Sequence, residues 1–140
     1  MVDCVFCEIV KGAIPSHILY QDQDFIAILD KYPIAFGHAL VMPKKHFERV
    51  NDLSIHNFGA LYARVYAINR IIISRMNASA SHISINDGAA ANQLIPHVHV
   101  HIIPRSLNDN AGFTARKLLK ADEMETICKK LRISDLSVDA

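Results

Sequence analysis

The chain has 140 residues with 15 basic and 14 acidic side chains, which gives a formal net charge of +1 at pH 7. This length, with about half of the residues apolar, predicts one domain around a single hydrophobic core. The near balance of charge excludes the broad basic surface of a typical nucleic-acid-binding protein. No apolar stretch reaches the ~20 residues of a membrane span, and the N-terminus lacks a signal-peptide pattern. Three cysteines favour a reducing, cytoplasmic setting over a disulfide framework.

The first predicted element is a short helix or turn over residues 4–11, which ends at Gly12. It contains Cys4 and Cys7 in a Cys-x-x-Cys spacing of the kind seen at zinc sites. One such pair supplies only half of the four ligands that a structural zinc site needs. From the spacing alone, two reduced cysteines without a metal and a redox pair therefore remain alternatives.

Strands and one long helix are predicted next along the chain. Two strands at 18–20 and 25–30 form a hairpin, and a short apolar strand at 39–42 ends at Pro43. Apolar residues recur at helical spacing through residues 54–77, and Asp52 or Ser54 could cap that helix. We interpret the resulting apolar stripe as facing the core or a dimer partner.

The C-terminal part holds another strand, a loop, the histidine-rich segment and a final helix. Residues 82–86 alternate and are predicted to pair with the histidine-rich strand, while 87–95 form the loop between them. We assign residues 1–110 to the main domain and 111–140 to a C-terminal extension, which packs on the same domain and carries a helix at 121–132. Strands, a long helix and further strands predict an α+β fold with an antiparallel sheet.

Residues 96–105 are the most informative stretch, because three histidines alternate with apolar residues between two prolines. Strict alternation predicts a half-buried strand with His97, His99 and His101 on one face. Prolines fit poorly inside sheets, so Pro96 and Pro104 are expected to bracket this strand. Side chains on one face of a strand stand roughly 6.6 Å apart, a spacing that suits an extended phosphate ester or anhydride. Two alternatives are that these histidines bind a metal or that they occupy an exposed polar face by chance. The apolar residues are expected to face the core: Val98, Val100 and Ile102.

This segment fits the His-φ-His-φ-His-φ-φ motif, with φ apolar, that names the histidine triad (HIT) superfamily. The resemblance covers roughly residues 3–105, and the Hint-like branch with a Cys-x-x-Cys pair is the nearest match. It implies an HIT-like five-stranded antiparallel sheet with two main helices, commonly paired into a homodimer. Further segments resemble the family: 6–10, 14–15, 25–30, 37–46, 84–88 and Gln93.

For the cysteine pair, the resemblance implies a zinc site completed by His46 and His97 beside Cys4 and Cys7. Four protein ligands would close the tetrahedral shell, so such a zinc would be structural and not catalytic. A metal-bound His97 could not act as a free base, but it would hold the chain beside the reacting histidine. Cys128 is expected to be a small apolar residue of the terminal helix.

A neutral imidazole is a competent nucleophile at neutral pH. The resemblance places the nucleophile at His99, which would attack the α-phosphorus of a nucleotide to form a nucleotidyl-His99 intermediate that water then hydrolyses. His101 would bind the phosphoryl oxygens and help the leaving group depart, and His38 would orient His99. A backbone carbonyl at the other ring nitrogen would fix the tautomer of His99.

Further residues resemble the family's binding site for a purine nucleotide. Asp30 resembles the carboxylate that accepts the ribose hydroxyls. Asn86 and Gln93 resemble side chains near the phosphates, where amides of the 87–95 loop could also donate. The alternative role of Asn86 and Gln93 is a hydrogen bond within the loop. The resemblance also implies an apolar slot for the base, whose residues could instead be plain core. That slot comprises Phe6, Ile9, Ile28 and Leu29.

The resemblance implies a nucleotide hydrolase that releases a nucleoside monophosphate from nucleoside phosphoramidates or dinucleoside polyphosphates. A nucleotidyl transferase is one alternative, although the transferase branch usually carries glutamine at the position of His101. A nucleotide-binding scaffold with little catalysis is another.

Two positions depart from the family pattern. Leu94 replaces a usual Ser or Thr that is thought to assist the leaving group, so we expect acidic leaving groups to be preferred. Asn92 replaces a usual glycine, which predicts an altered phosphate loop.

Overall fold

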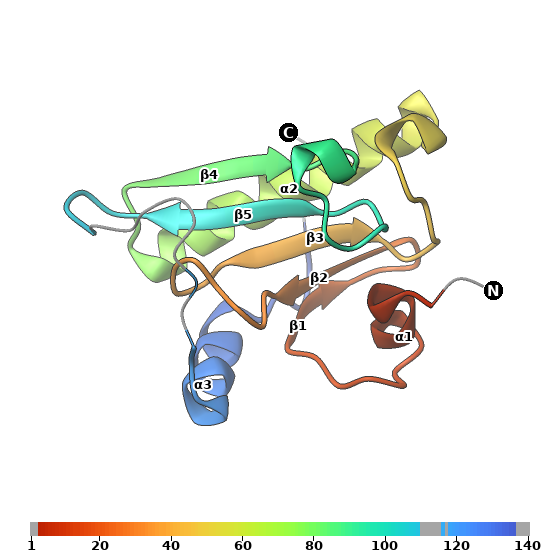
Figure 1. The fold of residues 1–140 in the computed structure, drawn as a ribbon. Coiled ribbons are helices and arrows are strands. Elements are labelled where there is room, and N and C mark those ends of the chain that lie inside the picture. The colour runs from red at the N-terminus through yellow and green to blue at the C-terminus, as the bar shows by residue number, and fades with distance from the viewer. Residues whose placement is uncertain (1–2, 110–115, 117, 137–140) are drawn as a thin grey trace.

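A five-stranded antiparallel sheet with strand order β1-β2-β3-β5-β4 forms the centre of the fold (Figure 1). The computed structural model describes residues 3–109, 116 and 118–136. This sheet and the two main helices, α2 and α3, confirm the predicted α+β fold. The elements are α1 (Val5–Val10), β1 (Ile18–Gln21), β2 (Phe25–Leu29), β3 (Ala39–Pro43), the 3-10 turn η1 (Val50–Asp52), α2 (Ile55–Met76), β4 (Ala80–Ile85), the 3-10 turn η2 (Ala89–Ala91), β5 (Val100–Arg105) and α3 (Ala121–Leu131).

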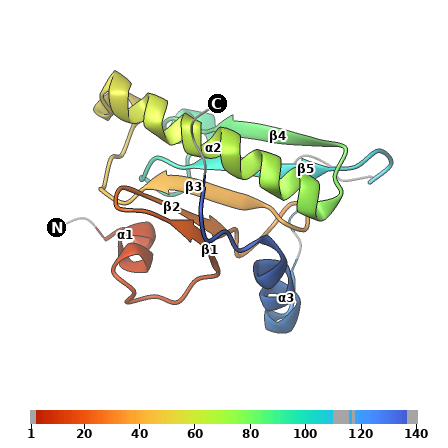
Figure 2. The same ribbon diagram turned by 180° about the vertical axis from the view of Figure 1, so that it is seen from behind.

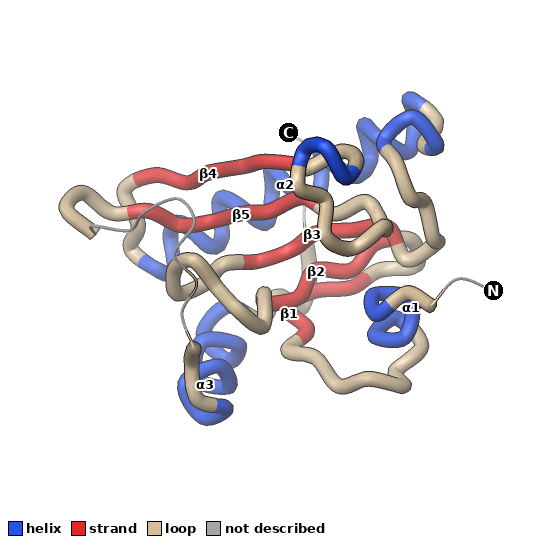
Figure 3. The backbone as a smooth tube through the Cα atoms, in the orientation of Figure 1, coloured by secondary structure: helices blue, strands red, loops and turns tan. Residues whose placement is uncertain are grey.

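The long helix α2 lies across one face of the sheet (Figure 2), and the main core is packed between them. Ser54 caps this helix, because its side chain accepts a hydrogen bond from the Asn57 amide, and Asn77 ends it in the left-handed conformation. The opposite face of the sheet carries α1 (Figure 3), with a smaller apolar cluster beneath it. This second face holds the histidines.

The histidine-rich strand differs from its predicted bounds. β5 begins only at Val100, because the chain is still in a turn at His97, whose N–H donates to the carbonyl of Ile95. Pro104 lies inside the strand and does not end it. The pairing of β3 with β5 stops at Ile102, so the missing N–H of Pro104 falls beyond the end of β3 and removes no ladder bond there. The predicted facing is correct: Val98, Val100 and Ile102 are buried in the main core.

The C-terminal helix α3 confirms the terminal helix that the sequence predicts over residues 121–132. It packs near β1, an edge strand of the sheet. Its buried side chains, Met124, Cys128 and Leu131, belong to the main core. After the helix, the Ile133 N–H donates to the carbonyl of Leu19 in β1. The predicted boundary at 110/111 lies outside the described residues. Within the described part of the chain, no helix is both long and apolar enough to cross a membrane.

Candidate active site and metal cluster

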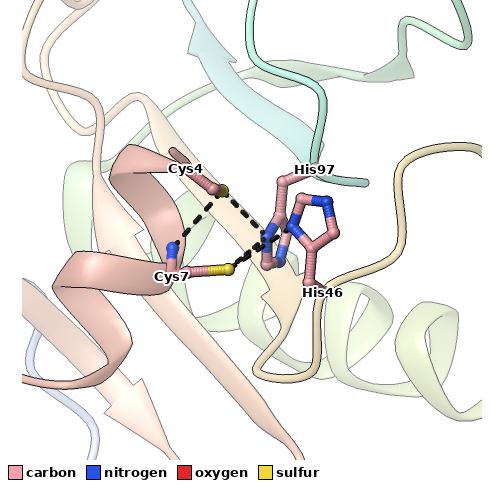
Figure 4. Close-up of side chains that lie close together, drawn as sticks. All are labelled: Cys4, Cys7, His46 and His97. Atoms are coloured by element: carbon pink, nitrogen blue, oxygen red, sulfur yellow. Dashed lines mark hydrogen bonds between the residues drawn. The ribbon is translucent and has the colours of Figure 1, made fainter. Parts of the chain in front are cut away.

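Four potential metal ligands meet where the N-terminal end of β5 approaches α1 (Figure 4). Cys4 and Cys7 come from the start of α1, His46 follows β3, and His97 precedes β5. One ligand atom from each lies within 4.8 Å of the others. The segments that carry these residues are far apart in the sequence, so the fold brings together the four residues that the family resemblance implies.

The spacing of these atoms fits a tetrahedral zinc ion. Cys7 Sγ lies 3.4 Å from His46 Nδ1 and 3.6 Å from His97 Nδ1, and Cys4 Sγ lies 3.4 Å from His97 Nδ1. Zinc bonds of about 2.3 Å to sulfur and 2.1 Å to nitrogen predict sulfur–nitrogen separations of about 3.6 Å in a tetrahedron. His97 Nε2–H donates to the Pro43 carbonyl at 2.8 Å, which leaves the Nδ1 lone pair facing the sulfurs.

Without a cation, the Cys7 thiol of this cluster holds its proton. Burial raises the pKa of the Cys7 thiol to about 11, with a further contribution from Cys4. Burial also lowers the pKa of His97 to about 4, so its ring is neutral at physiological pH. Metal binding would therefore release the proton of the Cys7 thiol but would meet a His97 imidazole that is already neutral.

The imidazole of His99 is held in one tautomer by the backbone. Its Nδ1 lies 2.7 Å from the carbonyl oxygen of His97, which can only accept, so Nδ1 carries the proton and Nε2 keeps its lone pair. The ring is buried and packs edge-on against Phe6, with ring centres 5.1 Å apart. Burial lowers the pKa of His99, which favours the neutral ring that a nucleophile requires. The expected backbone carbonyl is thus present.

His38 contacts His101, whereas the sequence-based expectation was that it would orient His99. The Ile34 N–H donates to His38 Nδ1 at 3.0 Å, so His38 Nε2 carries the proton and donates to His101 Nδ1 at 2.9 Å. His101 is thereby left with Nε2–H as a donor. The pairing of β3 with β5 explains this partner: Leu40 stands opposite His101, and residue 38 shares the face of residue 40.

The buried histidine pair predicts a loss of stability in acid. Burial is the main reason that the pKa of His38 falls from 6.5 to about 3, while the Asp30 carboxylate opposes that shift. Above pH 6.5 the side chain is neutral in both the folded and the unfolded chain and contributes no pH dependence. Between pH 6.5 and about 3 the unfolded chain binds a proton that the folded chain excludes, so stability falls as pH falls.

We expect His38→Asn to remove up to about 1.4 kcal/mol per pH unit of this dependence. The measurement is the free energy of urea unfolding from pH 7 to pH 4. His56→Asn, at an exposed position on α2, is the matched control and should leave the slope unchanged. An unchanged slope in His38→Asn would show that His38 is not a source of the acid sensitivity.

Asp30, the expected ribose ligand, follows β2 and lies beside His38. Its Oδ1 accepts from the Tyr32 N–H at 2.8 Å, and its Oδ2 lies 3.5 Å from His38 Nε2. Oδ2 also accepts from Arg116 Nη1 at 3.0 Å. The sequence reasoning missed Arg116, because nothing in its local pattern links it to a residue 86 positions away.

The loop before the histidines uses its amide side chains to hold its own shape. Asn86 Nδ2 donates to the Ala91 carbonyl at 2.6 Å. Gln93 accepts from the Gly88 N–H at 2.7 Å and donates to the Glu48 carbonyl at 2.8 Å. These contacts match the alternative role of a loop hydrogen bond.

The two departures from the family pattern, Asn92 and Leu94, also lie in this loop. Asn92 adopts a left-handed conformation, with φ of 66° and ψ of 31°. Asparagine tolerates that region better than most residues, which explains how it can stand where a glycine is usual. Leu94 is 84% exposed.

Three of the four residues expected to line a base slot lie together. Phe6, Ile9 and Ile28 belong to the smaller apolar cluster on the histidine face of the sheet. Leu29 belongs to the main core on the other face, because neighbouring residues of a strand point to opposite sides. Leu29 is therefore separated from the slot that the sequence-based expectation assigned to it.

The antiparallel sheet and its histidine row have counterparts among known proteins. The HIT domain family model matches residues 11–108, and the chain therefore belongs to the HIT domain family. The adenylylsulfatase HINT3 of Arabidopsis thaliana is 37% identical over 107 residues, which are 76% of this chain. The bis(5'-nucleosyl)-tetraphosphatase (asymmetrical) of Schizosaccharomyces pombe is 38% identical over 99 residues, or 71% of this chain. The aligned part spans only 54% of the length of each of these two relatives.

Solved structures agree on the fold. A hypothetical histidine triad nucleotide-binding protein from Sulfolobus tokodaii is 35% identical with a TM-score of 0.85, and the match covers 92% of this chain and 89% of that one. A Zn-bound histidine triad family protein from Mycobacterium smegmatis is 34% identical with a TM-score of 0.81, covering 92% of this chain and 93% of that one.

Proposed function

We propose that this chain is a nucleotide hydrolase that releases a nucleoside monophosphate through a covalent nucleotidyl-His99 intermediate. The observation that carries the proposal is the hydrogen bond from His99 Nδ1 to the His97 carbonyl, which directs the free lone pair to Nε2. The names of the Arabidopsis and fission-yeast relatives, an adenylylsulfatase and a nucleosyl-tetraphosphatase, support a nucleotide as the substrate class.

In the proposed reaction, His99 Nε2 attacks the α-phosphorus, and the bond from phosphorus to the leaving group breaks. A phosphoramidate forms, and water then attacks phosphorus, so that the monophosphate leaves and His99 is regenerated. Because His101 Nδ1 accepts from His38, the proton of His101 is on Nε2. This N–H would stabilise negative charge on the phosphoryl oxygens. Burial lowers the pKa of His101 to about 4, so a neutral donor is expected at pH 7.

The nucleoside would occupy the region around these histidines. We propose that a purine packs beside Phe6, Ile9 and Ile28, and that Asp30 accepts the ribose hydroxyls. Asn86 and Gln93 would shape the loop whose amides face the phosphates. When bound by Cys4, Cys7, His46 and His97, zinc would supply structural cross-linking of α1 to the chain before β5.

Trapping the intermediate tests the proposal. The protein would be incubated with adenylyl sulfate, diadenosine tetraphosphate and an adenosine phosphoramidate, quenched in alkali, and digested for mass spectrometry. We expect an adenylylated peptide with the modification on His99, together with adenosine monophosphate in solution. If no substrate class gave either product, the hydrolase proposal would be wrong.

The leucine at position 94 predicts faster turnover of substrates whose leaving group is acidic. Leucine has no proton to give, whereas an acidic leaving group such as sulfate or phosphate needs none. Because the side chain is 84% exposed, Leu94→Ser should not disturb packing. We expect this variant to speed phosphoramidate turnover on the order of 10-fold, which is below the ~10²- to 10⁴-fold that a fully positioned proton donor contributes. Turnover of adenylyl sulfate should stay unchanged. Equal effects on both substrates would contradict this role.

We also propose that the protein is a cytoplasmic homodimer. β4 is an edge strand, and its Ile83 is 44% exposed, which supports a partner on that edge. The three cysteines, Cys4, Cys7 and Cys128, support a reducing compartment, because such a small odd number favours it over a disulfide framework. The balanced charge continues to give no reason to expect nucleic acid as a partner.

A further inference from the structure

The carboxylate of Asp30 is covered by an arginine from outside the family domain. Arg116 Nη1 donates to Asp30 Oδ2 at 3.0 Å and to the Tyr32 carbonyl at 2.8 Å. The match to the family model ends at residue 108, so Arg116 belongs to the C-terminal extension of the chain. The contact therefore joins the extension to a residue that the proposed function requires.

Both carboxylate oxygens of Asp30 already have partners. Oδ1 accepts from the Tyr32 amide, and Oδ2 accepts from Arg116. The side chain of Asp30 is only 13% exposed, whereas that of Arg116 is 42% exposed. A ribose diol would need acceptor positions on the same carboxylate, and its hydroxyls would have to replace or crowd the guanidinium.

We propose that Arg116 competes with the ribose hydroxyls for Asp30 and so determines how strongly the site discriminates ribose from deoxyribose. This inference rests on the proposed function. A partly exposed ion pair is weak enough for a bound ligand to displace it, and the freed guanidinium would return to water. The ribose hydroxyls thus contribute less to affinity than they would at an uncovered carboxylate.

The test compares two nucleotides that differ only in the ribose. Adenosine 5'-monophosphate and its 2',3'-dideoxy analogue would be titrated calorimetrically into the wild-type protein and into Arg116→Ala. We expect the monophosphate to bind Arg116→Ala about 2- to 5-fold more tightly, as loss of a partly exposed competing ion pair allows. Binding of the dideoxy analogue should be unchanged. Arg116→Gln, which cannot form the ion pair, should behave in the same way.

Arg64→Ala is the matched control. Arg64 forms a similar ion pair, since its Nε lies 3.0 Å from Asp22 Oδ2. Asp22 precedes β2 and Asp30 follows it, so the two ion pairs lie at opposite ends of that strand. This variant should bind both nucleotides as the wild type does. In an Asp30→Asn background the effect of Arg116→Ala should vanish, because the competition needs the carboxylate.

Two results would overturn the inference, and they are distinguishable. If Arg116→Ala bound adenosine 5'-monophosphate as tightly as the wild type, or more weakly, Arg116 would not be a competitor. The hydrolase proposal would stand in that case. Absence of nucleotide binding in every variant would contradict the proposed function and the inference together.

Discussion

Replacing His99 with alanine is expected to abolish nucleotide hydrolysis, with kcat falling on the order of 10⁴-fold or more. Neither His97 nor His101 is placed to replace the nucleophile. His97 Nδ1 faces the two cysteine sulfurs, and His101 Nδ1 accepts from His38. The measurement is single-turnover release of adenosine monophosphate from adenylyl sulfate, with nucleotide affinity measured in parallel. Affinity should change little, because the base and ribose contacts remain.

His56→Ala is the control, since this histidine is exposed on α2. A His99→Ala variant that retains turnover would refute the covalent mechanism. A wild-type protein that binds nucleotide but shows no turnover would favour a scaffold. Adenylyl transfer to an acceptor in place of water would identify a transferase.

Removal of the metal should produce the second large effect. We expect about one zinc per chain in the purified protein. A ligand present at a thousandfold excess over its dissociation constant stabilises the folded state by about 4 kcal/mol. For a chain of this length, chelation should therefore lower Tm by roughly 10 °C or more. Activity should fall about 10- to 100-fold, because the carbonyl that orients His99 belongs to the proposed metal ligand His97.

Cys7→Ser should reproduce these losses without chelator. Cys128→Ser is the comparison, because that thiol is a buried side chain of α3, outside the metal cluster, and its replacement should leave the zinc content unchanged. Elemental analysis and thermal unfolding give the two readouts. Zinc far below one equivalent in freshly purified protein, with Tm insensitive to chelator, would contradict the metal site.

Sequence alone predicted the features that depend on local periodicity or on a short motif. Alternation correctly assigned Val98, Val100 and Ile102 to the core. The family resemblance supplied His46 and His97 as partners for the Cys4–Cys7 pair, and the fold places all four together.

Features that depend on strand register or on distant contacts were not predictable. The partner of His38 follows from the register of β3 against β5, which no local pattern records. Leu29 is an exception, because strand alternation alone puts Ile28 and Leu29 on opposite faces, so its assignment to the slot of Ile28 was avoidable. Arg116 reaches Asp30 across 86 positions of sequence and carries no motif.

The tautomers of His97, His99 and His38 are set by main-chain atoms: the carbonyls of Pro43 and His97 and the amide of Ile34. Main-chain groups are present whatever side chain a position carries. Substitutions around the site can therefore accumulate without altering where the imidazole protons sit. We therefore expect substitutions at positions 92, 94 and 116 to leave the protonation of these three rings unchanged, even where they alter the choice of substrate.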